Sequence, residues 1–361
     1  MLKALTDQLG QGRDLSAEQA AASVSQLVEA AAPVEAKADF LSALARKGET
    51  TGEIAAFACE LRARAVTPPL DAETRARDIL DVCGTGGDRL NTFNISTTVA
   101  LIAAAAGVTV AKHGNRAITS QSGSADVLEA LAIPIDLSPE QAAQSLREHG
   151  FAFFFAPRYH PAFKHIGPAR RLCAERGQRT IFNFLGPLLN PARPTAQLVG
   201  GPRPQLCEPL ARVLQSLGVR RGMVVSGRVG FQVPGSKFQG ADTVGEAAWL
   251  DELSTLGENT LAEFYQDRGF HTATLSPADF PLQPATLADL AGGDREANAE
   301  IIRRILRGDE RGPKREAVLL NAGAALLVAG KAKSVTEGWD LAAKLSDDGA
   351  ANAKLEELSC G

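Results

Sequence analysis

Cysteines and long apolar runs are scarce in this 361-residue sequence, and both shortages narrow what the protein can be. The five cysteines are scattered, odd in number and never spaced as Cys-x-x-Cys, so the sequence predicts neither a disulfide framework nor a zinc site. The longest apolar run, residues 99–111, is well short of the roughly 18 residues that a membrane-spanning helix needs. Residues 1–7 lack the basic and then apolar order of a signal peptide. We therefore expect a cytoplasmic protein with no membrane partner.

An excess of basic residues is also missing. The chain has 38 Lys and Arg against 42 Asp and Glu, a formal net charge of -4 and a pI near 5.8. Nucleic-acid-binding domains usually present a basic face, so we expect no nucleic-acid partner. The apolar content of 45% and the charged content of 22% are ordinary for a globular chain, and the length suggests about two domains.

The first 66 or so residues predict helices. Ser16 and Gln19 have the spacing of a capping box, and the apolar residues after them recur at helical intervals. Residues 34–46 and 51–65 repeat this apolar pattern. Thr67-Pro68-Pro69 then indicates a linker into a second domain. Part of the apolar surface of these helices is expected to form a subunit contact.

Glycine is concentrated where the sequence is most informative. An apolar run that ends at Cys83 breaks into Gly84-Thr85-Gly86-Gly87-Asp88, and a helix is predicted soon after, from about Ser96. A second strand, a polar loop at 112–116 and a second helix follow. This order of strand, loop and helix predicts neighbouring parallel strands. Loops that follow parallel strands lie at the same edge of the sheet, so both loops should face one crevice.

The chemistry of these two loops favours a ligand with phosphates at both ends. Glycines let a ligand approach the backbone, and helix N-termini attract anions. Asn94, Ser96 and Thr97 can cap the first helix or bind the anion, and Lys112 and Arg116 add positive charge. Either loop alone is more often a tight turn with plain helix caps. The two together favour the binding site.

The remaining sequence predicts further strands and helices of the same kind. Strands are expected at 151–155, 197–200 and 222–226, and helices at 206–217, 299–307, 315–329 and 335–344. Residues 166–191 are dense in proline and glycine and suggest a hinge where the chain crosses between domains. Residues 228–249 are rich in glycine without periodicity and are predicted to form a long loop.

An ordered set of motifs identifies a family resemblance. The motifs are Asp81-Val82-Cys83-Gly84-Thr85-Gly86-Gly87-Asp88, Thr92-Phe93-Asn94-Ile95-Ser96-Thr97, Lys112-His113-Gly114-Asn115-Arg116, Gly123-Ser124-Ala125-Asp126, His160-Pro161, residues 179–191 and Leu319-Leu320-Asn321-Ala322. Together they resemble the anthranilate phosphoribosyltransferases over nearly the whole chain. Pyrimidine nucleoside phosphorylases are similar in fold and also carry a Gly-rich phosphate loop, but their second loop differs from Lys112 to Arg116.

The resemblance implies a fold and a reaction. The fold would be an α/β fold of the nucleoside phosphorylase and phosphoribosyltransferase type. A small helical domain (residues 1–68, with a return segment at about 163–190) would join a larger α/β domain (69–162 and 191–361) with a mostly parallel sheet. The implied enzyme transfers the phosphoribosyl group of phosphoribosyl pyrophosphate to the amine of anthranilate in tryptophan biosynthesis. It would use Mg²⁺ and form a homodimer through the helical domain.

The same resemblance implies the site residues. Phosphoribosyl pyrophosphate would be bound by Gly84, Gly87, Asp88, Thr92, Asn94, Ile95, Ser96, Thr97, Lys112, Gly114, Asn115, Arg116, Ser120 and Ser124. Anthranilate would be bound by Gly84, His113, Asn115, Tyr159 and Arg170, and magnesium by Ser96, Asp251 and Glu252. Lys112, Asn115 and Arg170 are the predicted catalytic residues, and no general base is nominated because the aromatic amine is neutral at pH 7.

Alternatives remain for the site and for the function. Without the resemblance, Asp251 and Glu252 would read as a solvated acidic pair at a helix start, and Arg170 as a surface arginine. A related transferase or phosphorylase with another aromatic acceptor is one alternative function, and it depends on whether Asn115 and Arg170 line the acceptor pocket. A non-catalytic relative that binds nucleic acid is another, and it would lack the acidic pair. In the family, the chain passes almost directly from the strand that ends at Gly227 to this acidic pair, whereas here residues 228–249 lie between them.

Overall fold

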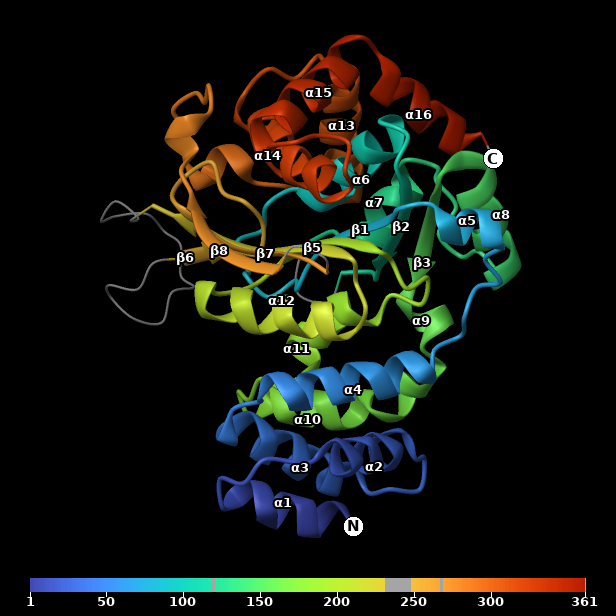
Figure 1. Cartoon of the computed structure of the whole chain (residues 1–361), viewed down its shortest axis with the longest axis vertical. Coiled ribbons are helices and arrows are strands. Elements are labelled where there is room, and N and C mark those ends of the chain that lie inside the picture. Colours follow the sequence, from blue (N-terminus) through green and yellow to red (C-terminus); the bar gives the residue numbers. More distant parts are fainter. Residues whose placement is uncertain (118–120, 231–247, 267–268, 361) are drawn as a thin grey trace.

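The computed structural model describes residues 1–117, 121–230, 248–266 and 269–360, and the chain forms two parts (Figure 1). The smaller part is a helical bundle whose apolar faces meet around Val24, Leu41 and Phe57, all fully buried. It consists of α1 (Leu2–Gly10), α2 (Ala17–Val28), α3 (Val34–Lys47), α4 (Thr51–Ala63) and α10 (Gly167–Glu175). Because α10 packs on α3, the chain returns to the bundle after it has entered the larger part.

Side chains at the helix starts hold the bundle in register. The predicted capping box of α2 is confirmed, since Ser16 Oγ accepts a hydrogen bond from the Gln19 N–H at 3.2 Å and Gln19 Oε1 accepts one from the Ser16 N–H at 2.9 Å. Thr50 and Glu53 form a second capping box at α4. The buried Glu53 carboxylate also pairs with Lys47 at 2.8 Å, which joins the end of α3 to the start of α4.

The larger part is built on a sheet that has eight strands in the described residues, in the order β3-β2-β1-β4-β5-β7-β8, with β6 paired to β5. The strands are β1 (Ile79–Gly84), β2 (Thr109–Gly114), β3 (Phe151–Phe155), β4 (Ala196–Gly200), β5 (Arg221–Val229), β6 (Ala248–Leu250), β7 (Asn259–Tyr265) and β8 (Gly269–Leu275). β1 to β5 are parallel, whereas β6, β7 and β8 are antiparallel to their neighbours. The predicted fold class, a small helical domain and a larger α/β domain with a mostly parallel sheet, is confirmed.

Helices cover both faces of this sheet (Figure 1). On one face lie α6 (Ile95–Ala105), α7 (Ser124–Ala130), α13 (Arg295–Leu306), α14 (Pro313–Val328), α15 (Val335–Asp347) and α16 (Ala350–Ser359). On the other face lies α12 (Cys207–Ser216), and α8 (Pro139–His149) packs on the edge strand β3. Short helices in the connections are α5 (Ala72–Ala76), α9 (Ala156–Tyr159), α11 (Phe182–Leu185) and the 3-10 helices η1 (Pro161–His165), η2 (Gly186–Leu189), η3 (Pro204–Leu206), η4 (Pro277–Asp279) and η5 (Leu287–Leu290).

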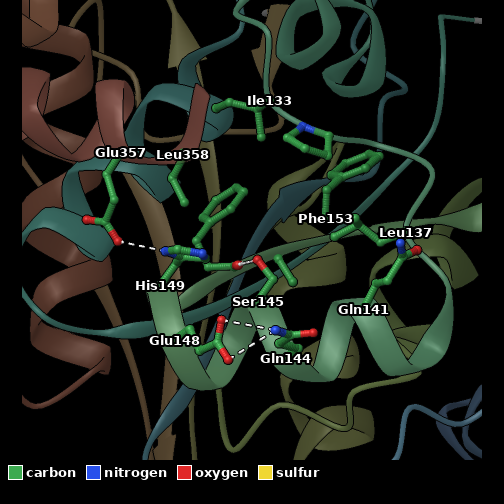
Figure 2. Close-up of a pocket in the computed structure, with 13 residues that line it drawn as sticks. Ile133, Leu137, Gln141, Gln144, Ser145, Glu148, His149, Phe153, Glu357 and Leu358 are labelled. Carbon is green, nitrogen blue, oxygen red and sulfur yellow. Dashed lines mark hydrogen bonds and ion pairs between the residues drawn. The ribbon is translucent and has the colours of Figure 1, made fainter. Parts of the chain in front are cut away.

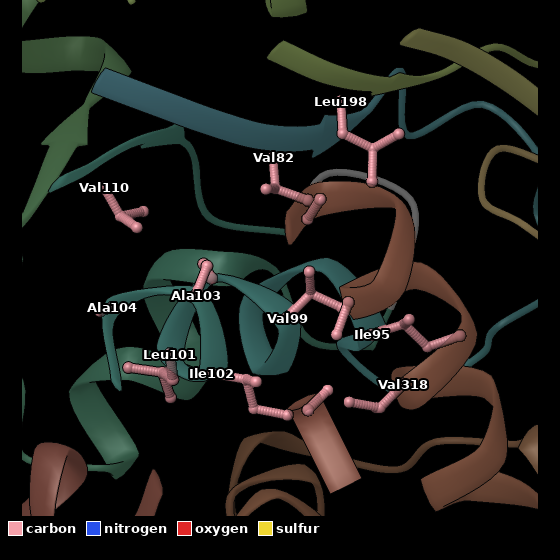
Figure 3. Packing of buried hydrophobic residues seen from close by; sticks show 14 of the residues in the cluster. Val82, Ile95, Val99, Leu101, Ile102, Ala103, Ala104, Val110, Leu198 and Val318 are labelled. Carbon is pink, nitrogen blue, oxygen red and sulfur yellow. The ribbon is translucent and has the colours of Figure 1, made fainter. Parts of the chain in front are cut away.

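The helix α6 lies at the centre of the main core (Figure 3). Its Val99 and Ile102 are fully buried in a cluster that includes Val82 and Leu198 of the sheet and Val318 of α14. Burying an aliphatic side chain of this size contributes about 1.5–3 kcal/mol. This packing fixes the axis of α6 and therefore the position of its N-terminus beside the Gly-rich loop.

Three parts of the sequence prediction were wrong in detail. Residues 112–114 continue β2 rather than forming a loop, because Lys112 and Gly114 pair with Phe153 and Phe155 of β3. The ends of the predicted loop at 228–249 are strands, since Arg228 and Val229 belong to β5 and residues 248–250 form β6. Residues 231–247 of that loop lie outside the described residues. The strands β7 and β8 were not predicted, because β8 is largely exposed and only its pairing with β7 makes it a strand.

A search of the described helices finds none that is long and apolar enough to cross a membrane.

Candidate active site

A cavity of about 380 Å³ opens at the carboxyl ends of β1 and β2, between the α/β part and the segment that returns to the bundle. Both loops predicted to face one crevice contribute to it, as do α10 and α11. The predicted site residues that line it are Gly84, Asp88, Thr92, Asn94, Ser96, Thr97, Lys112, His113, Gly114, Asn115, Arg116, Ser124, Arg170, Asp251 and Glu252. Residues separated by more than 160 positions in the sequence are thus brought to one site.

Four predicted residues are not among those that line the cavity. Ile95 is buried in the main core, and Gly87 lies beside the cavity next to Pro202. Tyr159 is fully buried against Phe154, and its hydroxyl donates to the Leu137 carbonyl at 3.2 Å, so this tyrosine is a core residue in the structure. Ser120 lies outside the described residues.

The Gly-rich loop wraps around the Asp251 carboxylate. Gly86 has φ +73°, a left-handed conformation that glycine adopts without strain, and its N–H donates to Asp251 Oδ2. The Thr85 hydroxyl donates to the same oxygen at 3.2 Å. A Cβ on Gly84 would lie 2.6 Å from Asp251 Oδ2, and one on Gly200 would lie 1.4 Å from the Asp251 carbonyl oxygen. The missing side chains therefore make room for the segment that carries Asp251, as well as for a ligand.

Three carboxylates converge beside this loop. Burial raises the pKa of Asp251, and the neighbouring Asp88 raises it further. Burial and the charge of Asp251 likewise raise the pKa of Glu252 well above its usual value. Asp251 is only 7% exposed and precedes no helix, so the alternative of a solvated acidic pair at a helix start does not hold. Buried carboxylates that lie close to one another favour a cation.

The chemistry of these donors fits Mg²⁺. Magnesium prefers oxygen ligands, and it usually shares one or two carboxylates with waters and substrate phosphates. Within the described residues, no group of three or more His, Cys, Asp or Glu side chains is arranged to hold a metal ion. Glu252 also accepts a hydrogen bond from the Ser96 N–H at 3.2 Å, at the N-terminus of α6. A cation bound here would share its site with substrate oxygens. It would lie next to Ser96, the hydroxyl-bearing residue that was predicted to bind it.

Two asparagines that the residue chemistry did not single out brace this half of the cavity. Asn321 of α14 accepts from the Leu253 N–H and donates to the Leu253 carbonyl, both at 2.9 Å, which anchors the chain directly after Glu252. Asn298 of α13 donates to Asn94 Oδ1 at 2.9 Å. Asn94 therefore makes no side-chain cap of α6, although the sequence allowed one. Asn321 belongs to residues 319–322, one of the motifs that carry the family resemblance, whereas Asn298 belongs to no motif in the sequence.

Lys112 reaches the cavity from inside the sheet. Its side chain is almost fully buried, and its Nζ donates to the Val82 carbonyl at 2.7 Å. Burial lowers the pKa of Lys112, while the nearby charges of Asp81 and Glu252 act in the opposite direction. Asp81 is itself buried and accepts from Asn190 Nδ2 at 2.9 Å. The lysine charge is thus held between β1 and β2, rather than on the polar loop that the sequence predicted.

The wall opposite the Gly-rich loop is aromatic and carries one guanidinium group. Arg170 of α10 lies over the Phe182 ring, with its guanidinium carbon 5.3 Å from the ring centroid. Burial lowers the pKa of Arg170, and no carboxylate among the described residues pairs with it. Phe163 packs edge-on against Phe182 at a centroid distance of 5.7 Å. We call Arg170, Phe163, Phe182 and His113 the acceptor wall.

His113 presents an unused ring nitrogen in this wall. Its Nε2 is buried without a hydrogen-bond partner among the described residues, and its ring lies 5.1 Å from that of His160. Burial and the neighbouring His160 lower the pKa of His113 to about 3, and burial lowers that of His160 to about 4. Both rings are therefore neutral at pH 7, and His113 can accept a hydrogen bond from a ligand.

Charges in the second loop are largely satisfied within the protein. Arg116 pairs with Asp126 and Glu129, each at 3.0 Å. Asp126 accepts from the N–H groups of Ala117 and Gly123, both at 2.9 Å, and so closes the loop onto the start of α7. Asn115 is exposed at the tip of the loop and lines the cavity. Ala117 and Gly123 are therefore held at the start of α7 by contacts within the protein.

A second cavity, of about 310 Å³, lies at the sheet edge between α8, β3 and α16 (Figure 2). Its polar side chains bond one another or the backbone: Gln144 donates to Glu148, Ser145 donates to the Phe151 carbonyl, and His149 pairs with Glu357 at 3.0 Å. Among the residues that line it, no catalytic set converges, in contrast to the first cavity.

The chain matches known proteins over almost its whole length. Residues 3–65 match the helical bundle domain of the glycosyl transferase family, and residues 76–352 match the a/b domain of that family. An anthranilate phosphoribosyltransferase of Lacticaseibacillus paracasei is 44% identical over 358 residues, covering 99% of this chain and 96% of the relative. One of Symbiobacterium thermophilum is 44% identical over 361 residues with the same coverage.

Comparison with solved structures points to the same family. The crystal structure of anthranilate phosphoribosyltransferase from Thermus thermophilus is 39% identical and superposes with a TM-score of 0.84, covering 99% of this chain and 98% of the other. The enzyme of Saccharomyces cerevisiae, in complex with PRPP and Mg, is 24% identical with a TM-score of 0.82 over 99% of this chain and 97% of the other, which shows a shared fold. Fold and cavity thus define a glycosyl transferase with a helical bundle and an a/b domain. Within that class, the chain belongs to the anthranilate phosphoribosyltransferase family.

Proposed function

We propose that this enzyme transfers the phosphoribosyl group of phosphoribosyl pyrophosphate to the amine of anthranilate, giving N-(5-phosphoribosyl)anthranilate and pyrophosphate in tryptophan biosynthesis. One observation carries the proposal: a single cavity joins the Gly-rich loop and the acidic pair Asp251 and Glu252 to Arg170 on the opposite wall. The first two suit a phosphorylated donor with its cation, and the last suits a planar carboxylate. The 44% identity to enzymes of this name supports the same reaction.

The donor is assigned to the Gly-rich loop and the start of α6. Gly84, Asp88, Thr92, Asn94 and Ser96 would surround its pyrophosphate, and the loop at 112–116 with Ser124 would hold the 5′-phosphate. Ser96, Asp251 and Glu252 would hold Mg²⁺, which when bound supplies positive charge against the oxygens of the leaving pyrophosphate.

The chain's own residues then orient the acceptor. Arg170 would pair with the anthranilate carboxylate, and the rings of Phe163 and Phe182 would flank the aromatic acceptor. Neutral His113 would accept a hydrogen bond from the amine, which leaves the nitrogen lone pair free to attack the ribose carbon C1 as its bond to pyrophosphate breaks. No strong base is needed, because the amine is uncharged at pH 7. Lys112 and the loop N–H groups would stabilise the departing charge.

Domain movement and assembly complete the proposal. The domain limits we propose are 1–68 with 163–190 for the helical domain, and 69–162 with 191–361 for the α/β domain. Closure of these domains would align the amine with C1 and exclude water. We also propose a cytoplasmic homodimer that associates through the helical domain.

The alternative of a related transferase with another aromatic acceptor is less well supported. It depended on Asn115 and Arg170 lying away from the acceptor pocket, and both line the cavity. The non-catalytic alternative predicted loss of the acidic pair, which is present beside the Gly-rich loop. Both observations favour the anthranilate reaction.

The test follows the fluorescence of anthranilate as it is consumed. The wild-type enzyme should remove the signal only when phosphoribosyl pyrophosphate and Mg²⁺ are both present. Arg170→Ala should raise the KM for anthranilate by at least about tenfold, because the carboxylate loses its bidentate partner. Arg171→Ala is the matched control, since Arg171 is exposed on the same helix and does not line the cavity. No turnover by the wild-type enzyme, with phosphoribosyl pyrophosphate still bound, would overturn the proposed acceptor.

A further inference from the structure

A chain of side-chain amides connects α13 to the residues around both loops of the first cavity. The Gly293 N–H donates to Asn298 Oδ1 at 2.8 Å, and Asn298 Nδ2 donates to Asn94 Oδ1 at 2.9 Å. Asn94 Nδ2 donates in turn to the Ser122 carbonyl at 3.2 Å. We call these three hydrogen bonds the amide relay. It joins the start of α13 to the start of α6 and to the residue just before Gly123 and α7.

The two ends of the amide relay fix the direction of every bond in it. A backbone N–H can only donate, so the Asn298 atom that faces Gly293 must be its carbonyl oxygen. The Asn298 nitrogen then faces Asn94, and only the Asn94 oxygen can accept from it. At the other end, the Ser122 carbonyl can only accept, which again requires the Asn94 nitrogen on that side. Asn298 therefore determines how the Asn94 amide is oriented.

Burial and close packing hold Asn298 beside Asn94. Asn298 is only 2% exposed. A Cβ on Gly292 would lie 2.9 Å from Asn298 Oδ1 and 2.8 Å from the Phe93 Cα, so only glycine allows this approach without a shift. The Gly292 N–H also donates to the Asn91 carbonyl at 2.9 Å. Residues 91–93 of the donor side are thus packed directly against the segment that leads into α13.

The orientation that results suits an anion. Asn94 lines the cavity, whereas Asn298 does not. An amide nitrogen carries two hydrogens, and the Ser122 carbonyl accepts one of them. In the described part of the chain the second hydrogen has no acceptor, so it is available to a ligand. A phosphate oxygen accepts such a hydrogen bond, but it is repelled by a carbonyl oxygen, which the opposite orientation of Asn94 would present.

We propose that Asn298 is a positioning residue for the donor site, because it fixes the Asn94 amide so that an N–H, and not the carbonyl oxygen, is offered to the phosphate groups of the donor. The inference rests on the proposed function for the identity of this donor. Asn298 acts on the ligand through Asn94. In Asn298→Asp the nitrogen that holds the Asn94 oxygen becomes an oxygen, so the Asn94 amide must turn its nitrogen toward the new carboxylate.

The experiment measures the binding of phosphoribosyl pyrophosphate with Mg²⁺ to the full-length chain by calorimetry, as a double-mutant cycle. Asn298→Asp should weaken binding by at least about tenfold, because an acceptor replaces a donor opposite the phosphate. Asn298→Ala leaves the Asn94 amide free to take either orientation and should weaken binding by about two- to fivefold. In an Asn94→Ala background, either change should weaken binding by less than about twofold further, since the amide through which Asn298 acts is gone.

Two further measurements separate this role from added charge and from loss of structure. Ala297→Asp places a carboxylate at the neighbouring, exposed position of α13 and should leave donor affinity within about twofold of the wild type. Steady-state kinetics of Asn298→Asp should show a raised KM for phosphoribosyl pyrophosphate with an unchanged KM for anthranilate. Thermal unfolding checks that each variant is folded. If Asn298→Asp does not fold, the neutral Asn298→Ala arm of the cycle decides.

The outcomes distinguish this proposal from the proposed function. Donor affinity equal to that of the wild type in both Asn298 variants, or an equal loss with and without Asn94, would overturn the positioning role even if anthranilate is consumed. A cycle that behaves as described would support the role even if anthranilate proved to be the wrong acceptor. A wild-type enzyme that does not bind phosphoribosyl pyrophosphate would overturn the proposed function, and this role with it.

Discussion

The two sides of the active-site cavity are built in different ways. The donor side, which consists of residues 84–88 and the Asp251–Glu252 pair, is made by backbone passing very close to backbone. The acceptor wall is made by a few side chains: one guanidinium over one ring, a second ring packed edge-on, and a neutral imidazole. A change on the donor side should therefore disturb the fold and the chemistry together. A change on the acceptor wall should act mainly on substrate affinity.

The largest effect is expected where the donor side is tightest. In Gly200→Ala the new Cβ would lie 1.4 Å from the Asp251 carbonyl oxygen, so the Asp251 segment must move. We expect roughly 3 kcal/mol or more of lost stability, together with nearly complete loss of kcat. Thermal unfolding and steady-state kinetics measure both. Gly201→Ala is the control, because its nearest contact would be an ordinary 3.7 Å. Equal behaviour of the two variants would contradict a donor side built by close backbone packing.

The acidic pair should show a conflict between stability and activity. Burial and Asp88 raise the folded-state pKa of Asp251 above its unfolded value, so ionised Asp251 destabilises the cation-free enzyme increasingly as pH rises from about 4 toward neutrality. Neutral Asp251→Asn should therefore raise the unfolding temperature of the cation-free enzyme at pH 8 by about 1–3 °C. It should also lower kcat by about 100-fold or more and abolish stabilisation by Mg²⁺ with phosphoribosyl pyrophosphate.

Asp340→Asn provides the comparison for this pair, because Asp340 is exposed on α15. It should change neither kcat nor the unfolding temperature. A less stable Asp251→Asn enzyme that keeps its full magnesium response would refute the role given to this carboxylate.

A smaller effect is expected on the acceptor wall. Phe182→Leu removes the ring beneath Arg170, whose guanidinium lies 5.3 Å from the ring centroid. Loss of a cation–π contact of about 0.5–1 kcal/mol should raise the KM for anthranilate by about two- to fivefold while the KM for phosphoribosyl pyrophosphate stays the same. Phe184→Leu, on the same short helix α11 but outside the cavity lining, should leave both constants unchanged. Equal shifts in both KM values would show that the wall also supports the donor side.

The smallest effect concerns the histidine behind the wall. The folded-state pKa of His160 is about 4, below the ordinary value near 6.5, so the unfolded chain binds a proton in this pH range that the folded chain excludes. The stability that neutral His160 contributes is therefore present above about pH 6.5 and is lost as the pH falls toward 4. When the pH is lowered from 7.5 to 5, the wild type should lose stability that His160→Gln does not lose. The free energy of unfolding of the variant should therefore rise by about 1–2 kcal/mol relative to that of the wild type. Denaturant unfolding at both pH values measures this, and parallel profiles would contradict a buried neutral ring.

Local signals were sufficient for much of the fold. The capping box at Ser16 and Gln19, the helix predicted at 206–217 and the strand at 151–155 depend on residues close in sequence, and the structure contains all of them. The strands β7 and β8 escaped prediction because they form by pairing with distant neighbours, β7 with β5 and β8 with β7, and their own sequences gave no clear strand pattern. The end of β2 was misread for the same reason: polar residues looked like a loop, but pairing with β3 keeps Lys112 in the strand.

The candidate site likewise has some features that local sequence predicts and others that only the fold determines. The sequence by itself determined that a Gly-rich loop, a basic second loop, Arg170 and an acidic pair exist in this order, because each is a local pattern of residue types. Only the tertiary structure decided how they are used. It placed Asp251 in the space that Gly84 and Gly200 leave open, buried Tyr159 away from the cavity, and brought Asn298 and Asn321 to brace the donor side. These contacts join residues far apart in the chain, and no local pattern specifies which distant groups will meet.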